Sequence, residues 1–245
     1  MGLAFFVRNE YSFLAPMSTV RPYPRPRITS PAGAVVEPAP ARRAARAGRT
    51  ATTRGQAPGR ADKREAILSA ALTLFVERGF HGTTVPEVAE WATVGAGTIY
   101  RYFDSKEALV NALYQREKGA IAARMLTDFP ADLGAREQFR ALWGRMAAYV
   151  VENPLGFAFL ELHNHASYLD ATSRVLEARI LAFGVNFVET AQQKGELRPG
   201  SPLLLIGLVL GAFVGLVSKA AQCGLTLDPA AWETAEQCMW EAVRI

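Results

Sequence analysis

The chain has 245 residues, enough for one large domain or two modest ones, and half of these residues are hydrophobic. So much apolar surface excludes a wholly disordered polypeptide. The net charge of +4 is uneven, because residues 1–60 carry ten arginines against two glutamates and the remainder is net acidic. The positive balance therefore belongs to the N-terminal segment and is not by itself an argument for nucleic-acid binding.

Residues 1–60 are rich in proline, arginine and alanine and show no apolar periodicity, so we expect them to be disordered. Two interpretations of this segment stay open. It is either a basic arm that adds non-specific DNA phosphate contacts or a solvated, dispensable extension. The arginines that would make such contacts are Arg42, Arg43, Arg46, Arg49 and Arg54.

Beyond residue 61, alanine, leucine, glutamate and arginine recur and predict helices. Asp62, Thr84 and Asp104 are each followed three residues later by glutamate, the spacing of a capping box, and so predict three helix starts. Further apolar stripes and stop signals predict helices at about 131–152, 155–162, up to 194, 201–223 and 228–244. With a short helix near 96–103, the sequence predicts an all-α fold of about nine helices.

The predicted helix at 201–223 contains fifteen consecutive apolar residues, from Leu203 to Val217. A membrane-spanning helix needs about twenty, so a buried helix of a soluble protein is favoured over a membrane-attached interaction protein. Within the run Gly207, Gly211 and Gly215 recur every four residues and share one helix face, which allows another helix to approach closely.

Between residues 84 and 103, two short helices are separated only by Thr93, Val94 and Gly95. This spacing is typical of a helix-turn-helix, although an ordinary three-helix subdomain would look similar. The outer face of the second helix would carry small residues, hydroxyls and one guanidinium, and it would fit a major groove about 12 Å wide.

The segment from Arg64 to Tyr114 closely resembles the DNA-binding domain of the TetR/AcrR family of transcriptional regulators, and the likeness extends over about 62–118. It is carried by the Ile-Leu-x-Ala-Ala-x-x-Leu-Phe opening, Gly79-Phe80, Thr83-Thr84, Gly97-Thr98-Ile99-Tyr100, Tyr102-Phe103 and Ser105-Lys106-Glu107. The family often has glycine at the position of Thr93 and serine or threonine at that of Gly95, which is where this chain departs from it.

The resemblance implies a set of contacts with double-stranded DNA. Thr98 and Arg101 would read bases, glycines and Ala96 would permit close approach, and the remaining side chains would hold phosphates. The residues so implied are Thr84, Gly95, Ala96, Gly97, Thr98, Tyr100, Arg101, Tyr102 and Lys106.

The resemblance divides the chain into the arm (1–60), a helix-turn-helix domain (61–121) and a ligand-sensing and dimerisation domain (122–245). The expected pocket would suit a small, mostly apolar molecule, and its candidate residues are Phe139, Trp143, Met146, Tyr149, Phe159, His163, Tyr168, Phe183 and Phe187. The expected homodimer interface includes Gly207, Gly211, Gly215, Trp232 and Met239.

The function implied is a cytoplasmic, nucleoid-associated repressor that a small molecule releases from a palindromic operator. The alternatives are a small helical enzyme or a non-regulatory helical interaction protein, but the chain lacks GxSxG, HExxH and GxxxxGK[ST]. Cys223 and Cys238 make no disulfide framework and match no zinc pattern, so we expect a reducing compartment, no metal, no cofactor and no membrane.

Overall fold

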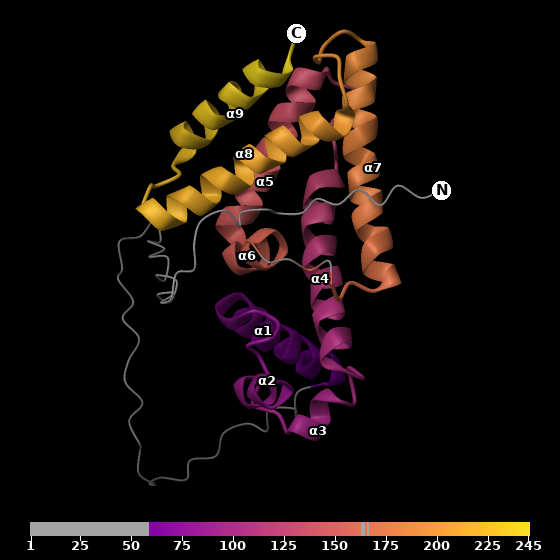
Figure 1. The fold of residues 1–245 in the computed structure, drawn as a ribbon, viewed down its shortest axis with the longest axis vertical. Helices are drawn as coiled ribbons and strands as arrows, with labels where there is room; N and C mark the ends of the chain where they lie inside the picture. Colours follow the sequence, from indigo (N-terminus) through magenta and orange to yellow (C-terminus); the bar gives the residue numbers. More distant parts are fainter. Residues whose placement is uncertain (1–58, 163–164, 166) are drawn as a thin grey trace, which may run out of the picture. The chain divides into compact units, whose positions relative to one another are not determined.

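The computed structural model describes residues 59–162, 165 and 167–245, and these residues form nine helices and no strand (Figure 1). The all-α class and the helix number predicted from the sequence are confirmed. The expected arm lies outside the described residues except for Gly59 and Arg60. The helices are α1 (Arg60–Arg78), α2 (Val85–Trp91), α3 (Ala96–Ile99), α4 (Lys106–Leu126), α5 (Ala135–Glu152), α6 (Pro154–Leu162), α7 (Ala171–Gln193), α8 (Pro202–Cys223) and α9 (Pro229–Val243).

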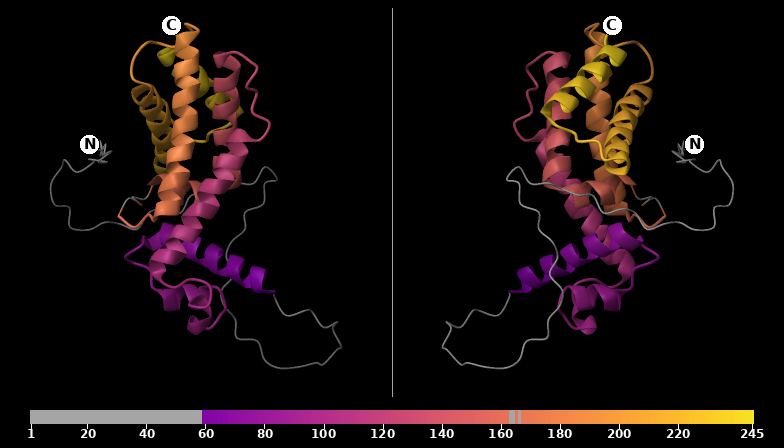
Figure 2. Two further views of the ribbon diagram at one scale, coloured as in Figure 1. Left: turned by 90° about the vertical axis from the view of Figure 1, so that its right-hand side faces the viewer. Right: turned by 90° about the vertical axis from the view of Figure 1, so that its left-hand side faces the viewer.

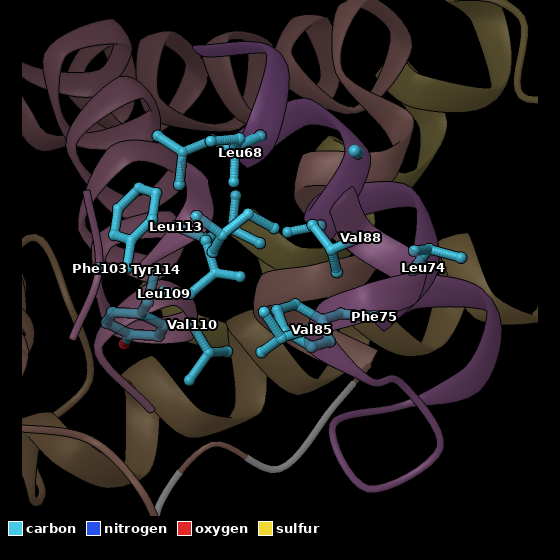
Figure 3. Packing of buried hydrophobic residues seen from close by; sticks show 14 of the residues in the cluster. Leu68, Leu74, Phe75, Val85, Val88, Phe103, Leu109, Val110, Leu113 and Tyr114 are labelled. Atoms are coloured by element: carbon cyan, nitrogen blue, oxygen red, sulfur yellow. The ribbon is translucent and has the colours of Figure 1, made fainter. Parts of the chain in front are cut away.

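Helices α1 to α4 build an N-terminal core around apolar residues at helical spacing. In α1, Ile67, Ala71 and Leu74 lie on one stripe and are fully buried, and Val88 of α2 and Ile99 of α3 are buried against them. Figure 3 shows how side chains from α1, α2 and α4 interlock in this core. The short helices are therefore held by tertiary packing, because α3 is too short to be stable alone.

A second core lies among α5, α7, α8 and α9. It is largely aromatic: the Trp143 ring meets Phe213 edge-on at 5.0 Å, and Phe213 stacks on Trp232 at 5.3 Å. Views from two opposite sides show α1–α3 gathered around one end of α4, with α5, α8 and α9 beyond its other end (Figure 2). Helix α4 contacts both groups, since it packs on α1, α5, α6 and α7.

Of the three helix starts predicted from capping-box spacing, one agrees with the structure. Thr84 is the N-cap of α2, and its hydroxyl accepts from the Glu87 N–H at 3.4 Å. Asp62 instead lies inside α1, where it accepts from the Gly59 N–H at 2.8 Å, so this helix begins earlier than predicted. At α4 the cap is Ser105 rather than Asp104, because the Ser105 hydroxyl accepts the Ala108 N–H at 3.1 Å.

Candidate nucleic-acid interface

The turn between α2 and α3 has the geometry of a Schellman motif. The Thr93 N–H donates to the Glu90 carbonyl at 3.1 Å, and the Val94 N–H donates to the Ala89 carbonyl at 2.9 Å. This closure requires a left-handed residue at position 93, where Thr93 has a φ of +57°. Thr93, a β-branched residue, therefore adopts the left-handed conformation in this turn, which glycine adopts at far lower energetic cost.

We expect the Thr93→Gly variant to be more stable than the unaltered protein by about 1 kcal/mol. Removing the left-handed strain gains about 1–2 kcal/mol, and the greater freedom of glycine in the unfolded chain returns part of it. Thermal and denaturant unfolding would measure the change. Thr127→Gly is the matched control, since Thr127 is exposed and has an ordinary φ of −63°. A loss of stability in both variants would contradict the assigned strain.

The outer face of α3 is bare at its N-terminal end. Gly95, Ala96 and Gly97 are exposed, and a side chain added at Gly97 would meet nothing within 4 Å. Gly95 has an ordinary φ of −69°, so neither its backbone nor its neighbours demand a glycine. The inner face is closed by Ile99, which is buried. Helix α3 therefore presents an open, sterically empty surface to any molecule that approaches it.

Polar side chains extend this surface along the C-terminal end of α3 and the residues that follow it. Tyr100 is 54 % exposed and Arg101 is exposed, whereas Thr98 and Tyr102 are half-buried. Within the described part of the chain, the Arg101 guanidinium makes no ion pair. The structure thus brings the predicted base-reading residues together on one face with a free cation.

Thr84 is less available than the resemblance implies. Its hydroxyl and its N–H both donate to the Glu87 carboxylate, at 2.7 and 2.8 Å, and Arg78 pairs with the same carboxylate at 2.7 Å. The hydroxyl hydrogen bond from Thr84 is the main reason that the pKa of Glu87 is lowered. A phosphate at Thr84 would have to displace these bonds, so the contact stays a prediction.

Lys106, the first residue of α4, lies over an aromatic column. Its Nζ is 4.2 Å from the centroid of the Phe80 ring, and Phe80 stacks on Tyr168 at 4.5 Å. The Tyr168 hydroxyl is 2.7 Å from Nδ1 of His165, and burial raises the pKa of Tyr168 to about 12. These contacts connect Tyr168 and His165, which follow α6, to Lys106, the residue that the resemblance predicts to bind a DNA phosphate.

Two cations near α3 were not among the sequence predictions. Arg60 and Lys63 lie in the first turn of α1 and line a groove of about 290 Å³ together with Thr98, Arg101 and Tyr102. A sequence signal does exist, because cations in the first turn oppose the helix dipole and are unusual there. Arg64 is the next residue of α1, and its guanidinium lies 5.4 Å from the Phe103 ring centroid.

Most of the predicted pocket residues that the structure describes divide between the two cores. Phe139, Trp143, Met146, Tyr149 and Phe187 belong to or pack on the C-terminal core. Phe159 and Tyr168 belong to or pack on the N-terminal core instead, and Phe183 meets Phe129 edge-on at 5.2 Å. His163 lies outside the described residues. The pocket therefore stays a prediction.

Buried polar groups lie where α4, α5 and α6 meet. The Tyr149 hydroxyl donates to Glu117 at 3.3 Å, and Arg116 Nε donates to the same carboxylate at 2.8 Å. Arg116 also pairs with Glu65 of α1. Gly156 leaves the space for this cluster, because a Cβ there would lie 2.4 Å from Glu117 Oε2. The charge network thus reaches from the C-terminal helices to α1.

The glycine stripe of α8 faces outward. Gly207, Gly211 and Gly215 are exposed, and added Cβ atoms would meet nothing within 4 Å. Leu204 and Leu208 on the same stripe are 59 % and 57 % exposed. Helix α8 is also the one described helix long and apolar enough to cross a membrane by length and composition. The stripe therefore leaves a large apolar surface uncovered.

The other two predicted interface residues lie inside the protomer. Trp232 stacks on Phe213, and its backbone carbonyl accepts from Nε1 of Trp143 at 3.2 Å. Met239 packs on the same core and is half-buried. Their role at an interface stays a prediction, whereas their place in the core of one protomer is clear.

The geometry defines a class of protein: an all-α protein with a helix-turn-helix in its N-terminal core and a second, largely aromatic helical core, which is the arrangement of a DNA-binding regulator. Comparison with known families then gives the family. The profile "Bacterial regulatory proteins, tetR family" matches residues 67–113, and "Tetracyclin repressor-like, C-terminal domain" matches residues 114–245. The chain belongs to the TetR family, whose members are transcriptional regulators rather than enzymes and are generally cytoplasmic.

Individual proteins agree with this assignment. An HTH-type transcriptional regulator of Haemophilus influenzae is 27 % identical over 184 residues, covering 75 % of this chain and 96 % of that protein. A transcriptional repressor of Mycobacterium tuberculosis is 33 % identical over 126 residues, or 50 % of this chain and 66 % of that protein. The crystal structure of a TetR-family regulator from Shewanella superposes with a TM-score of 0.65 at 26 % identity, covering 75 % of this chain and 98 % of that one.

Proposed function

We propose that this chain is a homodimeric repressor that binds a palindromic operator and leaves it when a small, mostly apolar molecule binds. In this proposal residues 61–121 bind DNA and residues 122–245 sense the molecule and dimerise. The bare outer face of α3 and its exposed Arg101 carry the proposal, because no other part of the described chain covers them. The similarity to a protein named a repressor supports the sense of regulation.

In the proposed complex α3 enters the major groove with its N-terminal residues against the base edges. Gly95 and Gly97 allow the backbone to approach closely, and Arg101 forms a bidentate pair with a base. Tyr100, Tyr102 and Lys106 hold phosphates and fix the register of the helix. Gly95 replaces the hydroxyl that the family often places there, so backbone contact takes over that role.

Arg101 and Lys106 are expected to differ in what they contribute. The Arg101→Ala variant should lose sequence preference at one base position by about 1–3 kcal/mol. Lys106→Met should instead weaken binding equally for all sequences and lower the salt slope by about 0.9, because one phosphate contact is lost while the stem stays on Phe80. Fluorescence anisotropy over a series of single-base operator variants and salt concentrations measures both. A uniform loss in Arg101→Ala would move Arg101 to the backbone contacts.

Dimerisation through α8 would account for its uncovered apolar stripe. One short recognition helix makes few contacts, so useful affinity requires two half-sites about 34 Å apart. A second copy placed on Gly207, Gly211 and Gly215 would bury the leucines beside them, and it would explain an apolar helix without a membrane.

Release by the small molecule would act through α4, which contacts the helices of both cores. A molecule that favours another tilt of α4 would move α3 away from operator spacing. A coupling of about 1–3 kcal/mol would weaken operator binding roughly 5- to 150-fold. Constant operator affinity across a broad metabolite screen would contradict the sensing role and leave the DNA-binding role intact.

Genome-wide footprinting with the purified full chain tests the proposal most directly. We expect a small set of bound fragments that share a palindrome, and the genes beside them would indicate the pathway and the class of molecule sensed. A flat profile at low salt, with no fragment enriched over input, would overturn the proposal.

A further inference from the structure

We propose that the groove between the first turn of α1 and α3 extends the DNA interface and holds a backbone phosphodiester of the bound duplex. Arg60 and Lys63 are its cations, and Thr98, Arg101 and Tyr102 form its other wall. The inference rests on the proposed function, since it assigns a further contact to the same complex. It adds α1 to a surface that otherwise consists of the turn, α3 and the start of α4.

The cations of the groove lack neutralising partners within the described residues. Lys63 and Arg101 make no ion pair, and Arg60 lies over the Tyr102 ring at 5.7 Å. No carboxylate lines the groove itself, and the two acidic residues close by on α1 have other partners. Asp62 accepts from the Gly59 N–H at 2.8 Å, and Glu65 pairs with Arg116 of α4. Arg60, Lys63 and Arg101 therefore line one groove, and no carboxylate lines it with them.

This arrangement is unfavourable for the isolated protein. Arg60 and Lys63 lie in the first turn of α1, where the helix dipole favours acidic side chains and Asp62 is the one acidic residue. The like charges also repel one another across the groove. An anion in the groove removes both penalties at once, which is what a binding site for a phosphate would do.

The position of the groove selects a phosphodiester of DNA over a free anion. Its far wall consists of Thr98, Arg101 and Tyr102, which belong to the outer face of α3 and its C-terminal turn. A duplex seated on that face brings its own backbone beside α3, and the cations of α1 lie next to it. The groove of about 290 Å³ is also large compared with the volume of about 30 Å³ that a single water occupies in the liquid.

The test uses the full chain with Arg60→Gln and Lys63→Gln combined, which removes both charges and keeps good helix formers in α1. The probe is a duplex selected from a random library by the unaltered protein. We expect the slope of log K against log salt to fall by about 0.9, because one phosphate contact is lost, and the ranking of operator variants to stay the same. Thermal unfolding should show no loss of stability.

The matched control combines Arg179→Gln and Lys194→Gln, which removes one exposed arginine and one exposed lysine from α7 and its cap. Its slope should equal that of the unaltered protein. An unchanged slope in the Arg60→Gln/Lys63→Gln variant, with normal binding by the unaltered protein, would overturn the groove alone. If the unaltered protein selects no duplex, the proposed function fails and the groove fails with it.

Discussion

The Gly211→Glu variant should be a monomer that has lost most of its operator affinity. Gly211 lies at the centre of the outward stripe of α8, after the exposed Leu204 and Leu208, and an added Cβ would meet no described atom within 4 Å apart from its own stretch of helix. The new side chain therefore has room in the protomer and places a charge only where a second copy would pack. Burying that charge without a partner is costly, so the dimer dissociates.

The effect on DNA binding follows from the loss of the second half-site. Two linked recognition helices bind up to about 10²- to 10⁴-fold more tightly than one, because the second contact is intramolecular. We expect a decrease in operator affinity within this range by anisotropy, together with a monomer in sedimentation equilibrium. The helical content should be kept, since glutamate forms helices better than glycine does.

Gly144→Glu is the matched control for this experiment. Gly144 is also an exposed helical glycine whose added Cβ would meet nothing within 4 Å, but it lies on α5, away from the stripe. This variant should remain a dimer with full operator affinity. If Gly211→Glu also stays dimeric, the dimer interface is not on α8. Another partner, such as a membrane, would then have to cover the apolar stripe of α8.

The helices were predictable because their signals are local. Apolar periodicity and stop residues depend on near neighbours in the chain, and so nine helices were expected where nine are described. The caps were less certain, because several polar residues often stand close to a helix start. At α4, Asp104 and Ser105 are both good N-cap residues. The structure places Ser105 at the cap, where its side chain accepts the Ala108 N–H.

The contacts between distant segments were not predictable in the same way. An aromatic residue at a core spacing has the same pattern whichever core it joins, so Phe159 and Phe139 were grouped although they lie in different cores. The same limit applies to Trp232, which was expected at the dimer interface and stacks on Phe213 of its own protomer. The departure at Thr93, in contrast, was visible in the sequence. A position that often carries glycine indicates a left-handed backbone, and any other residue there adopts that conformation with strain.

The second large effect is expected at Asn111 of α4, which is buried and holds the start of α7. Its Nδ2 donates to the Tyr168 carbonyl at 2.7 Å, and its Oδ1 accepts from the Asp170 N–H at 2.8 Å and the Ser173 hydroxyl at 2.9 Å. These groups form the N-terminal cap region of α7. Asn111 therefore ties α4 to the start of α7.

The Asn111→Leu variant should lose about 3 kcal/mol of unfolding free energy. Leucine fills a similar volume but leaves a carbonyl, an N–H and a hydroxyl without their partner, and each unsatisfied buried group costs about 1–3 kcal/mol. Against a typical stability of about 5–15 kcal/mol, this is a large fraction. Denaturant unfolding measures the loss, and hydrogen exchange should show faster exchange at the Asp170 N–H.

Gln115→Leu separates this specific role from a general effect of polar loss on α4. Gln115 lies one turn later and donates to the Ser173 hydroxyl at 3.1 Å, but its bonds to Asp170 are 3.4 Å long and it is half-buried. We expect a loss below about 1 kcal/mol, because water can replace its bonds. Equal losses in the two variants would show that Asn111 contributes only as any polar residue on α4 does. A loss confined to Asn111→Leu would identify this side chain as the polar link by which α4 holds the start of α7.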